Sequence, residues 1–459
     1  MKTRQLLASL LLTALATTAM AGGILTNTNQ SIDFLRNPAR DAAIGLDGVY
    51  SNPAGVAFMP EGFHLGLNWQ YAHQTRTITS TDEAFKLGRK NNGATVKMYE
   101  GVADAPCIPS IQAAYNTGDW SLQFNFSVPG GGGKCEFADG LGSFERVVGH
   151  LAQQLQPFGA QGYDMNGYMQ GRQYFFGFQL GSAYKVNDDL SVYGGLRLLY
   201  GTATYKARLS NIEVKTAGGY LDFGDFLTAI TPAATAAGYG EMIAPLHKYS
   251  EGVNLLCNQT GVGIAPVVGV DYRLGRWNLA AKYEFKTQMR MKNESTVFEA
   301  SEIPAVNKYR DGEEVNEDAP ALLTMGVQWN PIDPVRVSLG WHYYFDKQAE
   351  WYGNTQDELD HNTNEFLAGA EYDINDRITM SVGGQLTRYG LTDEYMNDMS
   401  FVVNSYSIGF GMNYKVNDKI TLKAAFFQTE YGKYERTTPS QDEFTRTNRV
   451  LGIGCDLKF

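Results

Sequence analysis

The segment from Val335 to Asp346 constrains the fold of this chain more than any other. Its side chains alternate without exception, with Val335, Val337, Leu339, Trp341, Tyr343 and Phe345 on one face and Arg336, Ser338, Gly340, His342, Tyr344 and Asp346 on the other. A repeat of two residues is that of a β-strand, and this run is longer than the roughly 5–6 residues usual in globular proteins. The same alternation recurs at 277–286 and 378–387. These patterns predict long strands that each have one wholly apolar face.

Short turns and long connections alternate between these strands. The short turns are rich in Asn, Asp and Gly, which tolerate the backbone of tight hairpins, and they lie at 116–119, 186–189, 273–276, 330–333, 374–376 and 416–418. The long connections are 79–109, 129–171, 208–261, 293–317, 348–361, 390–402 and 435–445. Short turns on one side and long loops on the other are typical of a barrel in a bacterial outer membrane.

The segments between these connections predict fourteen antiparallel strands. They are 62–78, 109–116, 119–128, 172–185, 189–207, 262–273, 276–292, 318–330, 334–347, 362–373, 377–389, 403–415, 419–434 and 446–459. The even number suits a bacterial outer-membrane barrel, and Tyr184, Tyr372 and Tyr414, each placed before a turn, suit an aromatic girdle. We therefore predict an all-β fold, a transmembrane β-barrel over residues 61–459, with a soluble β-sandwich as the alternative.

The two ends of the chain carry signals of export and assembly. Residues 1–21 read as a signal peptide, with Lys2 and Arg4 before an apolar stretch and Ala19-Met20-Ala21 as the cleavage site, so the mature chain is expected to start at Gly22. The terminal Phe459 closes an alternating strand and resembles the signal read by the outer-membrane assembly machinery. A net charge of −11 speaks against nucleic acid as a partner. We expect a monomer.

Residues 22–60 do not alternate and are predicted to fill the barrel lumen as a hatch, or plug. They mix charged residues with apolar ones such as Phe34, Leu35, Ile44 and Leu46. A polar lumen can satisfy the backbone groups and charges of such a segment. A flexible periplasmic tail is the alternative.

Within this segment lies a motif that points to a known family. Asn52-Pro53-Ala54 stands just before the first strand, preceded by Asp41-Ala42-Ala43-Ile44-Gly45 and by a second tripeptide, Asn37-Pro38-Ala39. Between a signal peptide and fourteen strands, this arrangement resembles the FadL/TodX family of outer-membrane transport proteins.

The resemblance implies a channel for hydrophobic molecules, either long-chain fatty acids or aromatic hydrocarbons. Extracellular loops would capture the ligand, which would pass to a site in the barrel and leave sideways through the wall. Asn52, Pro53 and Ala54 would be the hatch motif, and the mobile N-terminus would be Gly22, Gly23, Ile24 and Leu25.

Two long loops contain apolar residues at helical spacing, at 143–156 and 221–246. The candidate capture residues are Phe144, Leu151, Leu155, Phe223, Phe226, Leu227 and Ile230. Exposed apolar helices are costly unless they pair with each other or with an apolar ligand, so these helices either form a collecting groove or cap the barrel mouth. Arg172, Lys206, Arg208 and Lys248 could meet a carboxylate, or could face solvent or lipopolysaccharide.

The remaining residues point to no covalent chemistry. The six His show no metal-ligand spacing, and Ser338 and His342 lie too far apart along a strand for a catalytic pair, so we predict no enzyme, metal or cofactor. A disulfide between two of Cys107, Cys135 and Cys257 is open, with Cys107 and Cys135 the most plausible pair. A surface binding or adhesion protein, for haem for example, and a lipid hydrolase remain as alternative functions.

Overall fold

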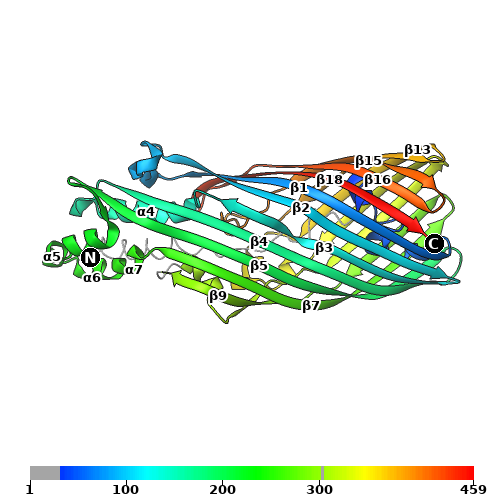
Figure 1. The fold of residues 1–459 in the computed structure, drawn as a ribbon, viewed down its shortest axis with the longest axis horizontal. Coiled ribbons are helices and arrows are strands. Elements are labelled where there is room, and N and C mark those ends of the chain that lie inside the picture. Colours follow the sequence, from blue (N-terminus) through cyan, green and yellow to red (C-terminus); the bar gives the residue numbers. More distant parts are fainter. Residues whose placement is uncertain (1–30, 301–303) are drawn as a thin grey trace.

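The computed structural model describes residues 31–300 and 304–459 and shows a closed antiparallel β-barrel (Figure 1). Over these residues fourteen strands form the wall. They are β1 (Gly62–Thr81), β2 (Val96–Thr117), β3 (Trp120–Phe137), β4 (Gly162–Lys185), β5 (Leu190–Thr216), β7 (Val253–Leu274), β8 (Trp277–Glu284), β11 (Leu322–Ile332), β12 (Val335–Tyr344), β13 (Thr363–Asn375), β14 (Ile378–Arg388), β15 (Ser405–Asn417), β16 (Ile420–Tyr431) and β18 (Gln441–Lys458). Pairing of β18 with β1, from His64 opposite Lys458 to Thr81 opposite Gln441, closes the barrel. The predicted fold is confirmed.

Four further strands extend the wall on the loop side. They are β6 (Gly219–Asp222), β9 (Arg290–Ala300), β10 (Glu314–Asn316) and β17 (Tyr434–Arg436). β9 continues β8 after an interruption at 285–289 and pairs with β7, while β10 pairs with β9. β6 pairs with the end of β5, and β17 pairs with β18.

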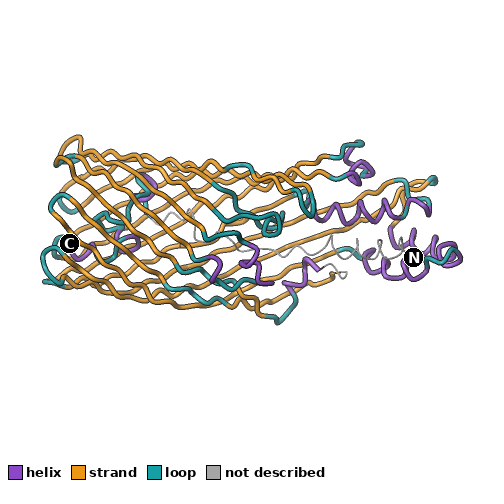
Figure 2. The backbone as a smooth tube through the Cα atoms, turned by 180° about the vertical axis from the view of Figure 1, so that it is seen from behind, coloured by secondary structure: helices purple, strands orange, loops and turns teal. Residues whose placement is uncertain are grey.

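The helices are short and gather in two places. Near the N-terminus are α2 (Ile32–Arg36), α3 (Gly48–Ser51) and η1 (Gly55–Phe58). The loops hold η2 (Glu83–Leu87), η3 (Arg89–Asn91), α4 (Gly142–Gln154), η4 (Gln156–Phe158), α5 (Phe223–Ala236), α6 (Gly240–Ile243), η5 (Ala244–Leu246), α7 (His247–Ser250), η6 (Pro304–Tyr309), η7 (Asp346–Gln348) and η8 (Tyr352–Glu358). Figure 2 shows α4 to α7 at the end opposite the C-terminus. Among the described residues, none of the helices has the length and apolarity needed to cross a membrane.

Several strands are longer than the alternation predicts. β2 begins at Val96 rather than 109, and β4 begins at Gly162 rather than 172. The reason is a reversal of the two faces. Near the end of β5, Lys206 and Arg208 are exposed outside, whereas Ala207 and Leu209 are buried inside. The apolar-out pattern therefore stops where the strand leaves the apolar band, although the strand continues.

The outer face of the barrel carries an apolar band between two aromatic rims. At the end with the short turns, the rings of Trp120 and Tyr184 lie 4.7 Å apart and those of Trp277 and Trp329 lie 5.4 Å apart. Tyr184, Tyr372 and Tyr414 are all exposed here, at the predicted positions. At the other end, the rings of Trp341 and Tyr343 lie 5.6 Å apart. Aromatic rings at these two levels suit the two interfaces of a bilayer.

Residues 31–60 pack against the inner face of the wall, where glycines make room for them. These glycines lie on neighbouring strands, and a Cβ on each would meet the N-terminal segment; they are Gly326, Gly340, Gly369, Gly383, Gly409, Gly411, Gly452 and Gly454. Three of them are consecutive ladder partners, since Gly369 pairs with Gly383 and Gly383 with Gly409. The high glycine content therefore serves a close approach between the wall and the segment inside it.

Replacing Gly409 by Ala should weaken this packing. A Cβ at Gly409 would overlap the backbone oxygen of Leu35, which cannot move independently of α2. We expect a loss of about 1–3 kcal/mol in the free energy of unfolding, the usual cost of overpacking. Thermal unfolding followed by heat-modifiable gel mobility checks this. Gly194→Ala is the matched control, because a Cβ there meets nothing within 4 Å; equal stability of the two variants would contradict the expectation.

Candidate functional site

The Asn-Pro-Ala tripeptide is fixed to the wall by each of its residues. The Asn52 side chain donates to Asp271 on β7 at 2.5 Å and accepts a hydrogen bond from the backbone N–H of Gly55 at 3.2 Å, at the start of η1. The backbone oxygens of Pro53 and Ala54 accept hydrogen bonds from Gln123 and Ser191, at 2.7 Å each. The motif therefore links the N-terminal segment to β3, β5 and β7. Gly22, Gly23, Ile24 and Leu25 lie outside the described residues.

Buried ion pairs attach the same segment to the opposite wall. Arg40 of the segment binds Asp47 at 2.8 Å and Glu371 on β13 at 3.1 Å, and Arg36 binds Glu371 at 2.6 Å. Asp41 contacts His342 on β12 at 2.9 Å, and the other ring nitrogen of His342 lies 3.1 Å from Glu365. Breaking one partner of a buried pair is costly, so the segment is held from all sides.

The ladder between β2 and β3 is interrupted about halfway along. The two strands pair from Gly101 to Asp104 and again from Ile111, so residues 105–110 have no partner in β3, and 127–133 have none in β2. Pro106, Pro109 and Pro129 lie in this stretch and lack a backbone N–H. The stretch also contains Gly130 to Gly133, with φ values of 104° at Gly131 and 71° at Gly133 that favour glycine. We call this interruption the β2–β3 gap.

A cavity of about 90 Å³ lies inside the barrel beside the β2–β3 gap. Its lining is partly aromatic or apolar and partly charged: Arg76, Gly133, Cys135, Phe137, Met169, Gly171, Arg172, Gln173, Tyr205, Lys308, Tyr309, Glu317, Met399 and Ser400. Several of these residues also belong to the apolar cluster described below. The cavity is too small for a whole long-chain fatty acid, so a ligand of that size would have to displace side chains around it.

Two arginines face each other at this level without an acidic partner. Arg76 on β1 and Arg446 on β18 are direct Cα partners in the closing ladder, on the faces that point inward. The Arg76 guanidinium donates to Gln74 at 3.0 Å and lies 5.9 Å from the Phe401 ring, and that of Arg446 lies 4.9 Å from the Tyr431 ring. Among the described residues neither forms an ion pair, and Nε of Arg446 is buried without a hydrogen-bond partner. Like charges placed directly opposite are unfavourable, so the pair is suited to an anion.

The predicted capture residues belong to one apolar cluster in the loops. Phe144 and Leu151 of α4, with Leu155 just after it, share this cluster with Phe223, Phe226 and Leu227 of α5, and Ile230 packs against it. The first six have exposed fractions of 7% or less, and Ile230 is half-buried. In this conformation the side chains therefore cap the barrel mouth, which favours the second interpretation of the loop helices over an open groove.

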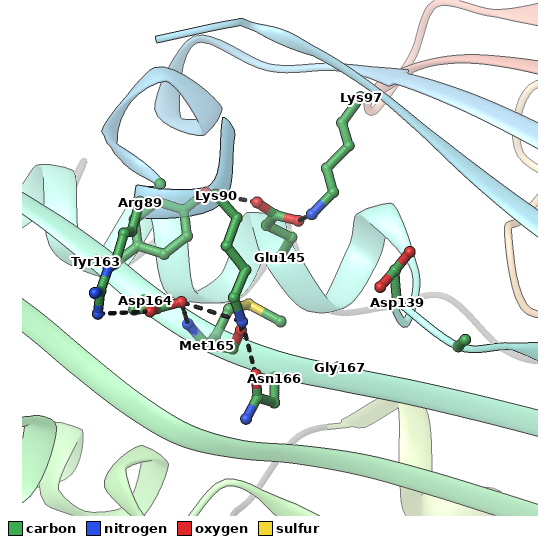
Figure 3. Close-up of a pocket in the computed structure, with 12 residues that line it drawn as sticks. Arg89, Lys90, Lys97, Asp139, Glu145, Tyr163, Asp164, Met165, Asn166 and Gly167 are labelled. Carbon is green, nitrogen blue, oxygen red and sulfur yellow. Dashed lines mark hydrogen bonds and ion pairs between the residues drawn. The ribbon is translucent and has the colours of Figure 1, made fainter. Parts of the chain in front are cut away.

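A polar pocket of about 200 Å³ lies on the outer side of this cap (Figure 3). Five of its six charged side chains are paired with described residues, with Asp139 as the exception: Asp164 binds Arg89 at 3.4 Å and Lys90 at 3.2 Å, and Glu145 of α4 binds Lys97 at 2.6 Å. Glu145 also accepts hydrogen bonds from Tyr99, Tyr163 and Asn91. The pocket thus ties α4 to β2 and β4, and its charged lining is unsuited to an apolar ligand.

Replacing Glu145 by Ala should loosen α4 without unfolding the barrel. The change leaves the Lys97 ammonium and the Tyr99 and Tyr163 hydroxyls unpaired. We expect it to lower the free energy of local unfolding of α4 by about 3 kcal/mol, which makes hydrogen exchange in α4 about a hundredfold faster. Glu83→Ala is the matched control, because Glu83 pairs with Lys86 on the exposed surface, where such pairs contribute little. Unchanged protection of α4 in Glu145→Ala would contradict this role.

The same contact makes the cap sensitive to acid. Burial alone would raise the pKa of Glu145, but the hydrogen bonds from Lys97, Tyr99 and Asn91 lower the pKa overall, below its usual 4.5. A lowered folded-state pKa means that the added stability is complete above pH 4.5 and is lost as the pH falls through the folded-state value. We therefore expect α4 exchange, corrected for intrinsic rates, to rise in wild type but not in Glu145→Ala as the pH falls below 4.5.

The structure also places the basic residues that were expected to meet a carboxylate, and the cysteines. Arg172, Lys206 and Arg208 are exposed on the outside of the barrel, and of the three only Arg172 also borders the cavity beside the β2–β3 gap. Lys248 lies in α7 at the tip of the loop region. All four cysteines are free, with Cys107 exposed and Cys135 buried, so the disulfide that the sequence left open is not formed. Cys107 falls in the unpaired part of β2, whereas Cys135 pairs with Ala103.

Arg76 and Arg446 were missed by reasoning from the sequence. The available signal was their position in the alternation, since Arg76 shares the inward face of β1 with Gln74 and Ile78. A cation that faces inward suggests a ligand or an acidic partner. Only the pairing of β1 with β18, which closes the barrel, places the two arginines opposite each other.

Comparisons with known proteins show a shared architecture. No family model and no curated protein matches the sequence. A FadL homologue from Pseudomonas aeruginosa superposes with a TM-score of 0.65 at 13% identity, over 95% of this chain and 100% of that one. The P. putida toluene transporter TodX superposes with a TM-score of 0.56 at 14% identity, over 90% of this chain and 94% of that one. The Ralstonia pickettii toluene transporter TbuX superposes with a TM-score of 0.53 at 16% identity, over 97% of this chain and 99% of that one.

Identities this low establish likeness of fold alone. The match nevertheless extends over nearly the full length of each chain, as expected from the Asn-Pro-Ala motif and the strand count. A closed barrel with an apolar outer band between two aromatic rims belongs in a bacterial outer membrane. This protein is therefore an outer-membrane β-barrel with the fold of the FadL and TodX channels.

Proposed function

We propose that this protein is a channel for passive uptake of hydrophobic compounds, and that its substrates are long-chain fatty acids. The observation that carries the choice of substrate is the pair formed by Arg76 and Arg446. Two inward arginines without an acidic partner, set beside aromatic rings, fit a molecule with one anionic end and an apolar body. A neutral hydrocarbon would leave both charges uncompensated in a largely apolar surrounding.

The proposed route has three stages. The apolar cluster of α4 and α5 takes up the ligand. Its side chains lose contacts with one another and gain contacts with the acyl chain; they are Phe144, Leu151, Leu155, Phe223, Phe226, Leu227 and Ile230. The carboxylate then binds Arg76 and Arg446. The ligand finally leaves sideways through the β2–β3 gap into the lipid.

The N-terminal segment supports a lateral exit rather than a path to the periplasm. Asn52, Pro53 and Ala54 are bonded to the wall on one side, and Arg36 and Arg40 on the other, so clearing the lumen would break many buried contacts at once. We propose that residues 22–60 act as a hatch that stays in place. Gly22 to Leu25 would be its mobile end, and residues 1–21 would be removed on export.

Aromatic hydrocarbons are the second candidate substrate, because two of the similar structures are toluene transporters. Uptake of labelled oleate and labelled toluene, by cells that lack their own fatty-acid channel and express this protein, separates the candidates. We expect uptake of oleate above the empty-vector level. Toluene uptake alone would favour the hydrocarbon channel. No uptake of either, from protein shown to be folded by gel mobility, would favour a surface binding protein.

The proposal also includes how the chain reaches and occupies its membrane. Phe459 is 68% exposed at the end of β18, with its ring 5.8 Å from that of Phe63. An exposed terminal aromatic on a closing strand suits recognition by the outer-membrane assembly machinery. A single chain closes its own barrel, so we propose that it acts as a monomer without metal, cofactor or covalent chemistry.

A further inference from the structure

Four basic side chains gather on the outside of the barrel along β3, β4 and β5. Lys134, Arg172, Lys206 and Arg208, which we call the basic wall patch, are all exposed. They alternate with buried residues that face inward, such as Cys135 between Lys134 and Glu136 and Ala207 between Lys206 and Arg208. The patch is therefore part of the outer wall, and Arg172 also borders the cavity beside the β2–β3 gap.

The strand register places these charges close together. Lys134 is the direct Cα partner of Arg172, Lys206 is opposite Gln170, and Arg208 is opposite Tyr168. Two carboxylates lie beside these side chains on the outer face. Glu136 binds Lys134 at 2.6 Å, and Asp104 on β2 is the other direct Cα partner of Lys134, so four basic and two acidic groups leave a charge of +2. Arg172, Lys206 and Arg208 form no ion pair with any described residue. Like charges across a ladder are unfavourable unless an anion lies between them.

The patch begins where the aromatic rim ends. Tyr174 follows Arg172 by two residues, about 7 Å along the strand. Its ring lies 6.0 Å from that of Phe176, which lies 6.5 Å from that of Tyr200. Because such rings mark the boundary between acyl chains and head groups, Arg172 stands at the level of the head groups, and Lys206 and Arg208 lie farther out.

The charge of the whole chain does not account for the patch. The protein carries −11 overall, yet this strip of wall is positive. Three strands from Lys134 along the same row of ladder partners, Arg449 on β18 is also exposed. Its partner His73 lies 2.8 Å from Asp104, so an acidic group separates Arg449 from the patch.

We propose that the basic wall patch binds the phosphate groups of lipopolysaccharide at the lipid A level of the outer leaflet. Arginine can hold a phosphate through two parallel hydrogen bonds, and lysine adds a compact positive charge. The glycolipid's acyl chains would lie on the apolar wall below Tyr174, and its phosphates between Lys134, Arg172 and Lys206. The site lies on the outer face of the wall, whereas Arg76 and Arg446, the proposed carboxylate site, lie on the inner face.

The test uses the full barrel purified in detergent and hexa-acylated lipid A as the probe. Native mass spectrometry measures the fraction of barrel that carries lipid A as the lipid concentration is raised. The patch variant combines Arg172→Glu, Lys206→Glu and Arg208→Glu, and the matched control is Arg449→Glu, also an exposed outward arginine. Heat-modifiable mobility confirms that each variant is folded. A second titration uses lipid A from which both phosphates have been removed.

We expect the patch variant to bind lipid A at least about tenfold more weakly than wild type, because it replaces three basic groups near the phosphates by acidic ones. Arg449→Glu should bind like wild type, and wild type should bind phosphate-free lipid A as weakly as the patch variant binds lipid A. Equal binding by wild type and the patch variant would overturn the proposal. So would an equal loss in Arg449→Glu, or equal binding of lipid A with and without phosphates.

Discussion

Oleate uptake should fall at least about tenfold when Arg76 and Arg446 are both replaced by methionine. Each arginine is expected to make a charge-assisted hydrogen bond to the carboxylate, which contributes about 1.5–3 kcal/mol. Methionine keeps the length and the contacts with Phe401 and Tyr431 while it removes the charge. The variant also loses a repulsion between two cations that are direct ladder partners, so the barrel should be at least as stable as wild type. Labelled oleate uptake by cells expressing each protein is the measurement.

Two comparisons make the outcome specific. Arg449→Met removes a cation from the outer face of the same strand and should leave uptake unchanged. Toluene uptake, if wild type supports any, should not fall in the double variant, because a neutral ligand gains nothing from the charges. Wild-type oleate uptake in Arg76→Met/Arg446→Met would contradict the carboxylate site, and an equal loss for oleate and toluene would indicate a blocked route instead.

The second large effect is expected at the β2–β3 gap. Replacing Ala105 by Trp should reduce oleate uptake to the empty-vector level. Ala105 lies across the gap from Gly133, where a Cβ would stand 3.6 Å from the Ala105 Cβ. An indole at this position occupies the space between the two strands and contacts the cavity that Gly133 lines. The strands are already unpaired here, so the side chain breaks no ladder hydrogen bond.

The matched control is Ala113→Trp on the same strand. Ala113 pairs with Phe124 where the β2–β3 ladder is continuous, so an indole there should leave uptake unchanged. Wild-type uptake in Ala105→Trp would show that the ligand does not leave through this gap. An equal loss in both variants would point to impaired folding, which gel mobility would reveal.

Reasoning from the sequence succeeded where a pattern is local and repeats. The alternation from Val335 to Asp346 and the turns rich in Asn, Asp and Gly identified the strands, because both depend on neighbouring residues only. It failed where a strand changes its surroundings. The predicted strand ended at residue 207, and Arg208 was assigned to a loop, because the neighbours of Lys206 and Arg208 face an apolar interior instead of lipid, which inverts the pattern without ending the strand.

The candidate site was only partly predictable. The apolar residues of α4 and α5 were identified from helical spacing, but their burial in one cluster depends on loops that are distant in sequence. Eight glycines of the wall lie beneath residues 31–60, and no local pattern in the sequence marks them. Such contacts cannot be found from spacing, because they join segments hundreds of residues apart.

The sequence by itself determined that this chain forms a long-stranded barrel with an apolar outer face, since strands with a period of two satisfy every backbone group in lipid only when they close into a ring. The tertiary structure alone decided which residues meet inside it. Arg76 and Arg446 oppose each other because barrel closure joins the first strand to the last. Asn52 reaches Asp271 because the segment folds back into the lumen. Both are consequences of closure, a property of the whole ring that no stretch of sequence contains.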